Sequence, residues 1–208
     1  MKIVTASQKT KRHPDWQTVF SEVSRDQLPW FTQELDADVV KALDRFVPID
    51  SLVWDLGCGE GTQSHLMADR GYRIIGTDVS QEAIAMAQDS FLPHEKLEFL
   101  VEDVFAARRV RAVDAIVDRG CFHVLSPAQV FSYIDRILPN LKDQGILILK
   151  SFAASSELDP GVGPHRYSEA QLKDILKPLK HLDSIEGQFM GPREYHPQSL
   201  TLVLKKGD

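Results

Sequence analysis

The chain has 208 residues, of which 43% are hydrophobic and 26% charged, and its formal net charge is −6. This length and composition fit one globular α/β domain and exclude both a disordered chain and two ordinary domains. The net negative charge argues against RNA or DNA as a substrate, because phosphate binding needs a basic face. No apolar run approaches the roughly 20 residues that cross a bilayer, so we expect no contact with a membrane.

The two cysteines, Cys58 and Cys121, stand far apart and outside any metal-ligand spacing. We therefore expect no disulfide, no metal site and a reducing compartment, which favours a cytoplasmic location. Residues 1–14 are polar and basic without an apolar core, so no signal peptide is expected. The composition does not indicate an oligomeric state.

The first 48 residues are predicted to form a helical arm that precedes the main domain at residues 49–208. Residues 13–24 can form a short helix, and a short apolar segment follows at residues 28–31. Val39, Val40, Leu43 and Phe46 recur at helical spacing, which predicts a helix over residues 36–46.

From residue 52 onward, predicted strands alternate with predicted helices. The strands are expected at residues 52–56, 73–78, 97–101, 113–117, 145–149, 181–189 and 199–204. Ser80, Ser126 and Ser168 are predicted helix caps, and the last two begin capping boxes. Such alternation is typical of a mostly parallel sheet with helices on both faces. Gly191 and Pro192 separate the last two strands, which predicts an antiparallel pair at the edge of the sheet.

The most informative segment is a glycine-rich turn, residues 55–62 (Asp-Leu-Gly-Cys-Gly-Glu-Gly-Thr), between the first strand and the following helix. A strand, a glycine turn and a second strand ending in Asp78 form a pattern that holds nucleotide-like cofactors. A dinucleotide site of the form G-x-G-x-x-G would require glycine at position 62, but this chain has Thr62 there. Asp55 would repel a pyrophosphate but suits a phosphate-free ligand with an ammonium group, such as S-adenosylmethionine.

Four carboxylates follow the first four predicted strands. They are Asp55, Asp78, Asp103 and Asp118. Ligands of parallel sheets bind beyond the carboxyl ends of the strands. We therefore expect these acids to face one ligand-binding edge.

From residue 52 to the C-terminus the pattern resembles the class I S-adenosylmethionine-dependent methyltransferases. The resemblance implies an α/β, Rossmann-like three-layer sandwich whose seven-stranded, mostly parallel sheet has an antiparallel C-terminal strand. It also implies that Gly57 and Gly59 approach the methionine portion of the cofactor and that Asp78 accepts both ribose hydroxyls. The full set of cofactor-binding residues that we expect is Trp30, Asp55, Leu56, Gly57, Cys58, Gly59, Thr62, Asp78, Val79, Ser80, Glu102, Asp103, Val104, Asp118, Arg119 and Gly120.

A finer resemblance links two segments to small-molecule methyltransferases of the thiopurine, thiol and tellurite-resistance group. These segments are residues 28–30 (Leu-Pro-Trp) and residues 118–123 (Asp-Arg-Gly-Cys-Phe-His). The resemblance implies that Trp30 covers the cofactor as a lid and that residues 164–168 stand where the group carries a loop over the acceptor. The loop at residues 161–167 is expected to help set the shape of the acceptor site. The catalytic candidates are Asp118, Arg119, His123, His165 and Arg166. Two alternatives stay open: Asp118 and Arg119 can form a structural ion pair, and His123 can be a general base or a structural histidine.

The sequence therefore predicts methyl transfer from S-adenosylmethionine to a small acceptor, with S-adenosylhomocysteine as product. A thiol or another soft nucleophile is favoured, since a thiolate needs little help from a base. Three alternatives are a protein or nucleic-acid methyltransferase, a cofactor-binding protein without turnover, and an NAD-linked oxidoreductase. The missing third glycine and the absence of a Tyr-x-x-x-Lys pair count against the oxidoreductase.

Overall fold

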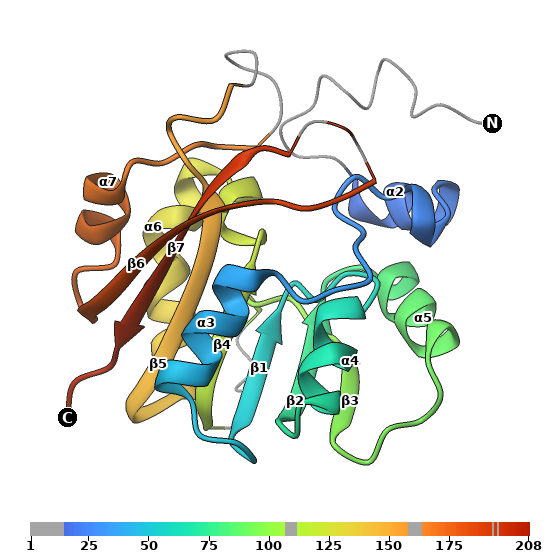
Figure 1. Ribbon diagram of the computed structural model, residues 1–208, viewed down its shortest axis with the longest axis horizontal. Helices are drawn as coiled ribbons and strands as arrows, with labels where there is room; N and C mark the ends of the chain where they lie inside the picture. The colour runs from blue at the N-terminus through green and yellow to red at the C-terminus, as the bar shows by residue number, and fades with distance from the viewer. Residues whose placement is uncertain (1–14, 107–111, 158–163, 193, 195) are drawn as a thin grey trace.

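The computed structural model describes all residues except 1–14, 107–111, 158–163, 193 and 195. The described residues form a seven-stranded sheet in the order β3-β2-β1-β4-β5-β7-β6 (Figure 1). The strands are β1 (Leu52–Leu56), β2 (Arg73–Asp78), β3 (Leu97–Val101), β4 (Val113–Arg119), β5 (Leu141–Phe152), β6 (Lys180–Gln188) and β7 (Gln198–Lys205). β7 runs antiparallel to both of its neighbours, and every other neighbouring pair is parallel. The predicted fold class is confirmed.

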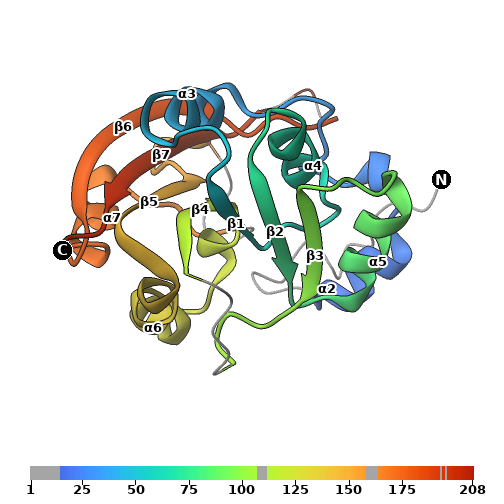
Figure 2. The ribbon, with the colours of Figure 1, turned by 90° about the horizontal axis from the view of Figure 1, so that it is seen from below.

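Helices cover both faces of the sheet, as Figure 2 shows. They are α2 (Trp16–Glu22), α3 (Ala37–Phe46), α4 (Thr62–Asp69), α5 (Gln81–Ser90), α6 (Pro127–Ile137) and α7 (Glu169–Ile175). Three short 3₁₀ segments join them: η1 (Arg25–Gln27), η2 (Phe122–Val124) and η3 (Leu138–Asn140). Within the described part of the chain, none of the helices is long and apolar enough to cross a membrane.

The two large apolar clusters of the core lie one on each face of the sheet, and a small third cluster of Phe20, Leu28 and Ala83 joins the arm to α5. α3 and α4 pack on one face through residues such as Leu43 and Met67, while α6 and α7 pack on the other through residues such as Ile137 and Leu172. Both predicted capping boxes are present, and they fix where α6 and α7 begin. This burial on both faces explains the unbroken apolar run of β5.

Three strands are longer than the sequence pattern predicts. β4 continues through Asp118 to Arg119, β5 begins at Leu141 and ends at Phe152, and β7 gains one residue at each end. β5 pairs with β4 in two stretches on either side of a register shift, and Gln144 between them has a φ of 63°. The sequence pattern did not predict the first stretch of β5, because polar residues at this irregularity interrupt it. Strands are predicted from continuous apolar residues or from alternating apolar and polar residues.

The part of the arm that contains α2 lies over the carboxyl edge of the sheet, whereas α3 packs on one face (Figure 1). α2 packs on α5, and the side-chain carbonyl of Gln17 accepts hydrogen bonds from the Ser80 hydroxyl and the Glu82 N–H. The β6–β7 connection crosses the same edge, and a Cβ on Gly191 would lie only 2.2 Å from the Pro29 carbonyl oxygen. Both segments therefore close over the place where a ligand of a parallel sheet binds.

Candidate functional site

The glycine turn after β1 has a backbone that other residues cannot easily adopt. Gly57, Gly59 and Gly61 have φ values of 72°, 55° and 79°, in the left-handed region that favours glycine. The N–H groups of Gly57 and Cys58 both donate to the Thr77 carbonyl, at 2.8 and 2.9 Å, which fastens the turn to β2. The turn thus presents bare backbone at the edge of the sheet.

Asp78, the last residue of β2, is held by the backbone on both sides. Its Oδ2 accepts from the Gly59 N–H at 3.0 Å, and its Oδ1 accepts from the Ser80 N–H at 2.9 Å. Burial raises the pKa of Asp78, and these two hydrogen bonds partly oppose that rise. The Val79 N–H also acts on this carboxylate, but a carboxylate has about four acceptor positions, so acceptor capacity remains for a hydroxyl group of a ligand.

Asp55, by contrast, is turned into the protein. Only 2% of the residue is exposed, and its Oδ2 accepts the Ser64 hydroxyl of α4. Burial raises the pKa of Asp55 to about 7. The structure therefore does not place an open carboxylate at this position, although the sequence analysis expects Asp55 at the mouth of the turn.

Trp30 and Phe20 of the arm cover the glycine turn. A Cβ on Gly59 would lie 3.4 Å from the Phe20 ring and 3.8 Å from Trp30 Nε1. The Trp30 indole N–H donates to Glu60 Oε2 at 3.0 Å, and its ring meets Phe20 edge-on at 5.9 Å. Trp30 thus lies where the resemblance implies, while Phe20 and Glu60 are residues that the sequence analysis missed.

Thr62 also contacts the arm, because its hydroxyl accepts from the Arg25 guanidinium at 2.9 Å. Cys58 is buried, and burial raises its thiol pKa well above the usual value. A buried thiol with a raised pKa is not suited to act as a nucleophile. Leu56 is buried, whereas half of Val79 is exposed beside Asp78.

Asp118 is fully buried and saturated with hydrogen bonds. Its carboxylate accepts the N–H groups of Cys121 and Phe122 and the Tyr133 hydroxyl, the last at 2.7 Å. Burial raises the pKa of Asp118 to about 6. These contacts hold the turn after β4, so Asp118 supports the site from within.

Arg119 does not pair with Asp118, so the structural ion pair considered in the sequence analysis does not form. Its guanidinium binds Asp36 with two hydrogen bonds, at 2.9 and 3.0 Å, and also donates to the Trp30 carbonyl at 3.3 Å. Arg119 therefore joins β4 to the arm.

Asp36 and Arg119 belong to a buried charge cluster, which we define as Asp36, Asp38, Arg119 and Lys150. Lys150 Nζ lies 2.6 Å from Asp36 and 2.7 Å from Asp38, and its side chain is 0% exposed. Burial tends to raise the pKa of Asp36, but Arg119 and Lys150 outweigh it and lower that pKa. Two cations balance two carboxylates, which is the condition under which charges are tolerated in a protein interior.

Aromatic side chains continue from this cluster toward the end of β4. The Phe189 ring lies 5.4 Å from the Arg119 guanidinium carbon and 4.9 Å from Lys150 Nζ. The imidazole of His123 stacks on Phe152 at 4.5 Å and meets Phe189 edge-on at 5.2 Å. This aromatic wall of His123, Phe152 and Phe189 borders Gly120, whose added Cβ would lie 3.3 Å from the imidazole.

The remaining predicted residues lie at three places. Asp103 is exposed and caps its own turn by accepting the Phe105 N–H at 2.8 Å, and Val104 packs against the core. The Glu102 N–H donates to the Asp78 carbonyl at 2.9 Å, so this segment lies beside the glycine turn. His165 is beside His123 through its backbone N–H, which donates to the His123 carbonyl at 2.7 Å.

Arg166 contacts the segment after β5. Its guanidinium donates to the Ser156 carbonyl at 3.1 Å. The glycines at positions 161 and 163, which the sequence analysis includes in the acceptor loop, lie outside the described residues.

Comparison with known proteins finds similarity to methyltransferases. A family model described as a methyltransferase domain matches residues 53–145. The chain is 29% identical over 152 residues to an Escherichia coli O-antigen chain terminator bifunctional methyltransferase/kinase, covering 70% of this chain but only 20% of that protein. It is 24% identical over 181 residues to thiocyanate methyltransferase 1 of Arabidopsis thaliana, covering 85% and 77% of the two chains.

A solved structure agrees with the family. The fold matches that of N-methyltransferase NodS from Bradyrhizobium japonicum with a TM-score of 0.71, at 16% identity and over 93% of this chain and 100% of that one. Residues 53–145 thus match a methyltransferase domain, and the fold is that of the S-adenosylmethionine-dependent methyltransferases.

The residues of the methyltransferase domain fit this cofactor. Asp78 has acceptor capacity left for a ribose diol, the glycine turn offers bare backbone, and Trp30 covers both. Among the residues that the structure describes, no group of three or more metal-ligating side chains is found.

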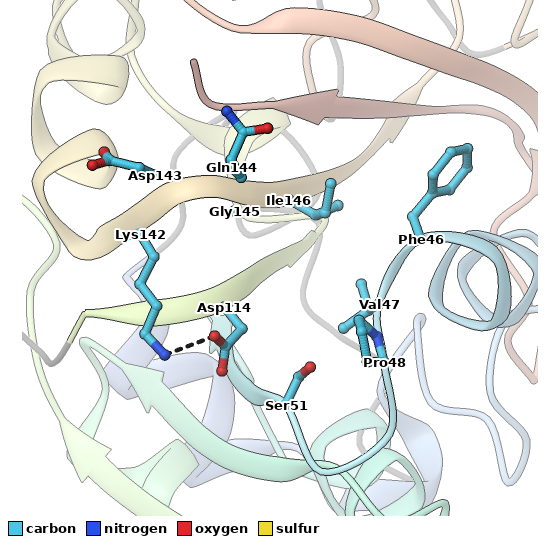
Figure 3. Close-up of a pocket in the computed structure, with 10 residues that line it drawn as sticks. All are labelled: Phe46, Val47, Pro48, Ser51, Asp114, Lys142, Asp143, Gln144, Gly145 and Ile146. Carbon is cyan, nitrogen blue, oxygen red and sulfur yellow. Dashed lines mark hydrogen bonds and ion pairs between the residues drawn. The ribbon is translucent and has the colours of Figure 1, made fainter. Parts of the chain in front are cut away.

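Two cavities of the methyltransferase domain lie away from the glycine turn. One, of about 190 Å³, lies at the opposite edge of the sheet, where the Lys142–Asp114 ion pair of 2.7 Å spans β5 and β4 (Figure 3). The other, of about 590 Å³, lies between the start of α3 and the end of β6, with Asp38 and Met190 in its lining. Neither is lined by a residue predicted to bind the cofactor.

Proposed function

We propose that this protein transfers a methyl group from S-adenosylmethionine to a small acceptor with a soft nucleophilic atom, such as a thiol. One observation carries the proposal: the glycine turn and Ser80 hold Asp78 with two backbone hydrogen bonds and leave it with free acceptor capacity. That arrangement suits a ribose diol without a phosphate nearby.

The covered edge favours a small acceptor over a macromolecule. The arm and the β6–β7 connection meet over the carboxyl edge, where Gly191 packs directly on Pro29. The net charge of −6 gives no support to a nucleic acid as acceptor. The likeness to a thiocyanate methyltransferase supports a soft nucleophile as the acceptor class.

When bound, the cofactor supplies an activated methyl group on a sulfonium, so the protein contributes mainly alignment and exclusion of water. Asp78 would hold the ribose, and Gly57 and Gly59 would let the backbone approach the rest of the cofactor. Val79 offers an apolar surface beside Asp78, and the segment of Glu102 and Asp103 follows it along the same edge. Gly120 would border the methyl group.

Trp30 acts in this proposal as the lid. It is fixed at two points, because its indole N–H donates to Glu60 and its carbonyl accepts from Arg119. Phe20 and Trp16 pack against its ring and keep water from the glycine turn.

The free thiols of Cys58 and Cys121 are compatible with a reducing compartment such as the cytoplasm.

Titration calorimetry with S-adenosylhomocysteine and with NAD tests the cofactor. We expect a heat of binding only with S-adenosylhomocysteine, and a heat of binding only with NAD would contradict the proposal.

Asp78→Ala should weaken S-adenosylhomocysteine binding by about 1–3 kcal/mol through lost charge-assisted hydrogen bonds. Asp89→Ala, an exposed carboxylate on α5, is the control and should bind as the wild type does. If a folded Asp78→Ala variant bound S-adenosylhomocysteine as tightly as the wild type, Asp78 would not be part of the binding site.

The acceptor is tested by incubating the protein with labelled S-adenosylmethionine and a panel of thiols, halides, amines and hydroxylated aromatics. Mass spectrometry should find methylated products among the thiols and halides. A panel without product, combined with methylation of a protein or nucleic acid, would favour the macromolecular alternative.

A further inference from the structure

We propose that His123 is the hydrogen-bond donor that orients the methyl acceptor, and that it does not remove a proton from it. This inference rests on the proposed function, because it assigns a role on the acceptor side of the same site. It assigns His123 a third role, in place of the general base and the structural histidine that the sequence left open.

The position of His123 supports a role beside the transferred methyl group. The strand order changes direction between β1 and β4, and ligands of such sheets bind at that switch point. Gly120 lies just beyond the end of β4 there, and an added Cβ on Gly120 would lie 3.4 Å from His123 Nε2. The glycine therefore leaves this face of the imidazole uncovered by a side chain.

Its hydrogen bonding fixes which nitrogen carries the proton. His123 Nδ1 accepts the Phe152 N–H at 3.3 Å, so in the neutral imidazole the proton must be on Nε2. No partner for Nε2 is found among the residues that the structure describes. The imidazole thus presents an N–H donor, and not a free lone pair, toward Gly120.

The surroundings keep the imidazole neutral. Phe152 and Phe189 enclose its ring, and Arg119 and His165 are the ionisable groups that bear on it. Burial, with both of these groups acting in the same direction, lowers the pKa of His123 to about 3. A group that stays neutral at pH 7 and has its lone pair occupied is poorly suited to act as a base.

The chemistry that follows needs no proton transfer by the protein. The lone pair of the acceptor forms the bond to the methyl carbon while the carbon–sulfur bond breaks, and the bonding electrons stay on sulfur. An anionic acceptor and the sulfonium thereby become two neutral products. The donor hydrogen bond from His123 is strongest to the anion before transfer, so it should contribute more to binding than to the rate of transfer.

Steady-state kinetics with iodide and with thiophenol separate the two roles, because iodide carries no proton at any pH. His123→Phe keeps a ring that can stack on Phe152 but removes the donor, and His123→Gln places an N–H near the position of Nε2. We expect His123→Phe to raise the KM of both acceptors about tenfold or more, with kcat within about twofold of the wild type. His123→Gln should recover most of that loss.

A base would give a different pattern. His123→Phe would then lower kcat with thiophenol by about 10²–10⁴-fold and leave iodide unaffected, which would overturn the inference. A wild type that binds S-adenosylhomocysteine but methylates neither acceptor would also overturn it, while the proposed function would stand. Failure to bind S-adenosylhomocysteine would instead remove the proposed function itself.

Nitrogen-15 NMR of the histidine side chains gives a readout that does not depend on turnover. We expect His123 to show the Nε2–H tautomer unchanged from pH 5 to pH 8. A proton on Nδ1, or titration of His123 within that range, would contradict the inference whatever the kinetics show. Loss of the assigned signal in His123→Gln identifies the residue.

Discussion

The two halves of the candidate site are built in different ways. The half at β1 and β2 consists of the glycine turn and Asp78, which lie close together in the chain and are joined by backbone hydrogen bonds. The half at β4 and β5 depends on side chains from distant segments, such as Arg119 on Asp36 and Lys150 on Asp38. The first half is fixed by backbone geometry, and the second by tertiary packing of charges and rings.

This difference predicts how each half responds to change. A backbone turn tolerates replacement of neighbouring side chains but not of the glycines that have a positive φ. A buried charge cluster depends on all of its members, because removing one leaves an uncompensated charge in a low-dielectric interior. Mutations in the two halves therefore test different physical causes.

The largest expected effect comes from the charge cluster. Lys150→Met removes the cation between Asp36 and Asp38, and we expect it to lower the free energy of unfolding by about 3–5 kcal/mol. Lys150→Met combined with Asp38→Asn should lose less than the single variant, since the second change removes the stranded charge. Urea unfolding at constant pH and salt measures both.

The exposed Arg45–Asp183 pair is the matched control, with side chains 62% and 26% exposed. Arg45→Met should cost only about 0–1 kcal/mol, because solvent screens the pair. Equal losses for Arg45→Met and Lys150→Met would show that the charge cluster contributes no more than a surface ion pair.

Sequence patterns predicted the first half well and the second half poorly, and the reason is physical. Glycine spacing, a strand-end acid and a helix cap are local signals, and Asp78 lies where they indicate. The partners of Arg119 and Lys150 are set by which segments meet in the fold. Asp36 and Asp38 are 83 and 112 positions away from the cations that they bind, so no local pattern marks them.

Because local patterns do not mark contacts between distant segments, the predictions for individual site residues were only partly successful. The resemblance singled out Trp30 as a cover of the cofactor, and the structure places its side chain over the glycine turn, whereas no pattern marked Phe20 or Glu60. Asp55 and Asp118 were expected to face a ligand, but Ser64 and Tyr133 bind them inside the protein. A strand-end position predicts the edge of the sheet but not the direction of the side chain.

A medium effect is expected in the first half, from the third glycine of the turn. Gly61 has a φ of 79°, and a Cβ added there would lie 2.6 Å from the Phe99 ring and 2.8 Å from Ala87. Gly61→Ala should therefore destabilise the protein by about 1–3 kcal/mol, through backbone strain and overpacking. Thermal unfolding, compared with that of Gly207→Ala, measures the difference.

Gly207 has no atom within 4 Å of an added Cβ, so its replacement should leave the unfolding temperature nearly unchanged. If Gly61→Ala were as stable as Gly207→Ala, the turn would be more adaptable than its backbone angles indicate. The two halves of the site would then differ less than we propose.

The last effect is a dependence of stability on pH that comes from the buried carboxyl groups. Burial raises the pKa of Asp55 to about 7 and that of Asp118 to about 6, from an ordinary value of 3.8. The folded protein therefore binds more protons than the unfolded chain between about pH 4 and pH 7. Their contribution to stability is complete below pH 4 and is lost as the pH rises to about 7, by at most about 1.4 kcal/mol per pH unit for each group.

Asp55→Asn isolates one of these groups, because the amide is neutral at every pH and its oxygen can still accept the Ser64 hydroxyl. Urea unfolding from pH 4 to pH 7 should show a flatter decline for Asp55→Asn than for the wild type, while Asp89→Asn on the exposed face of α5 should follow the wild type. Parallel curves for Asp55→Asn and the wild type would mean that Asp55 is ionised in the folded protein. It would then be a buried negative charge beside the glycine turn, where it would attract a cationic ligand as the sequence alone suggests.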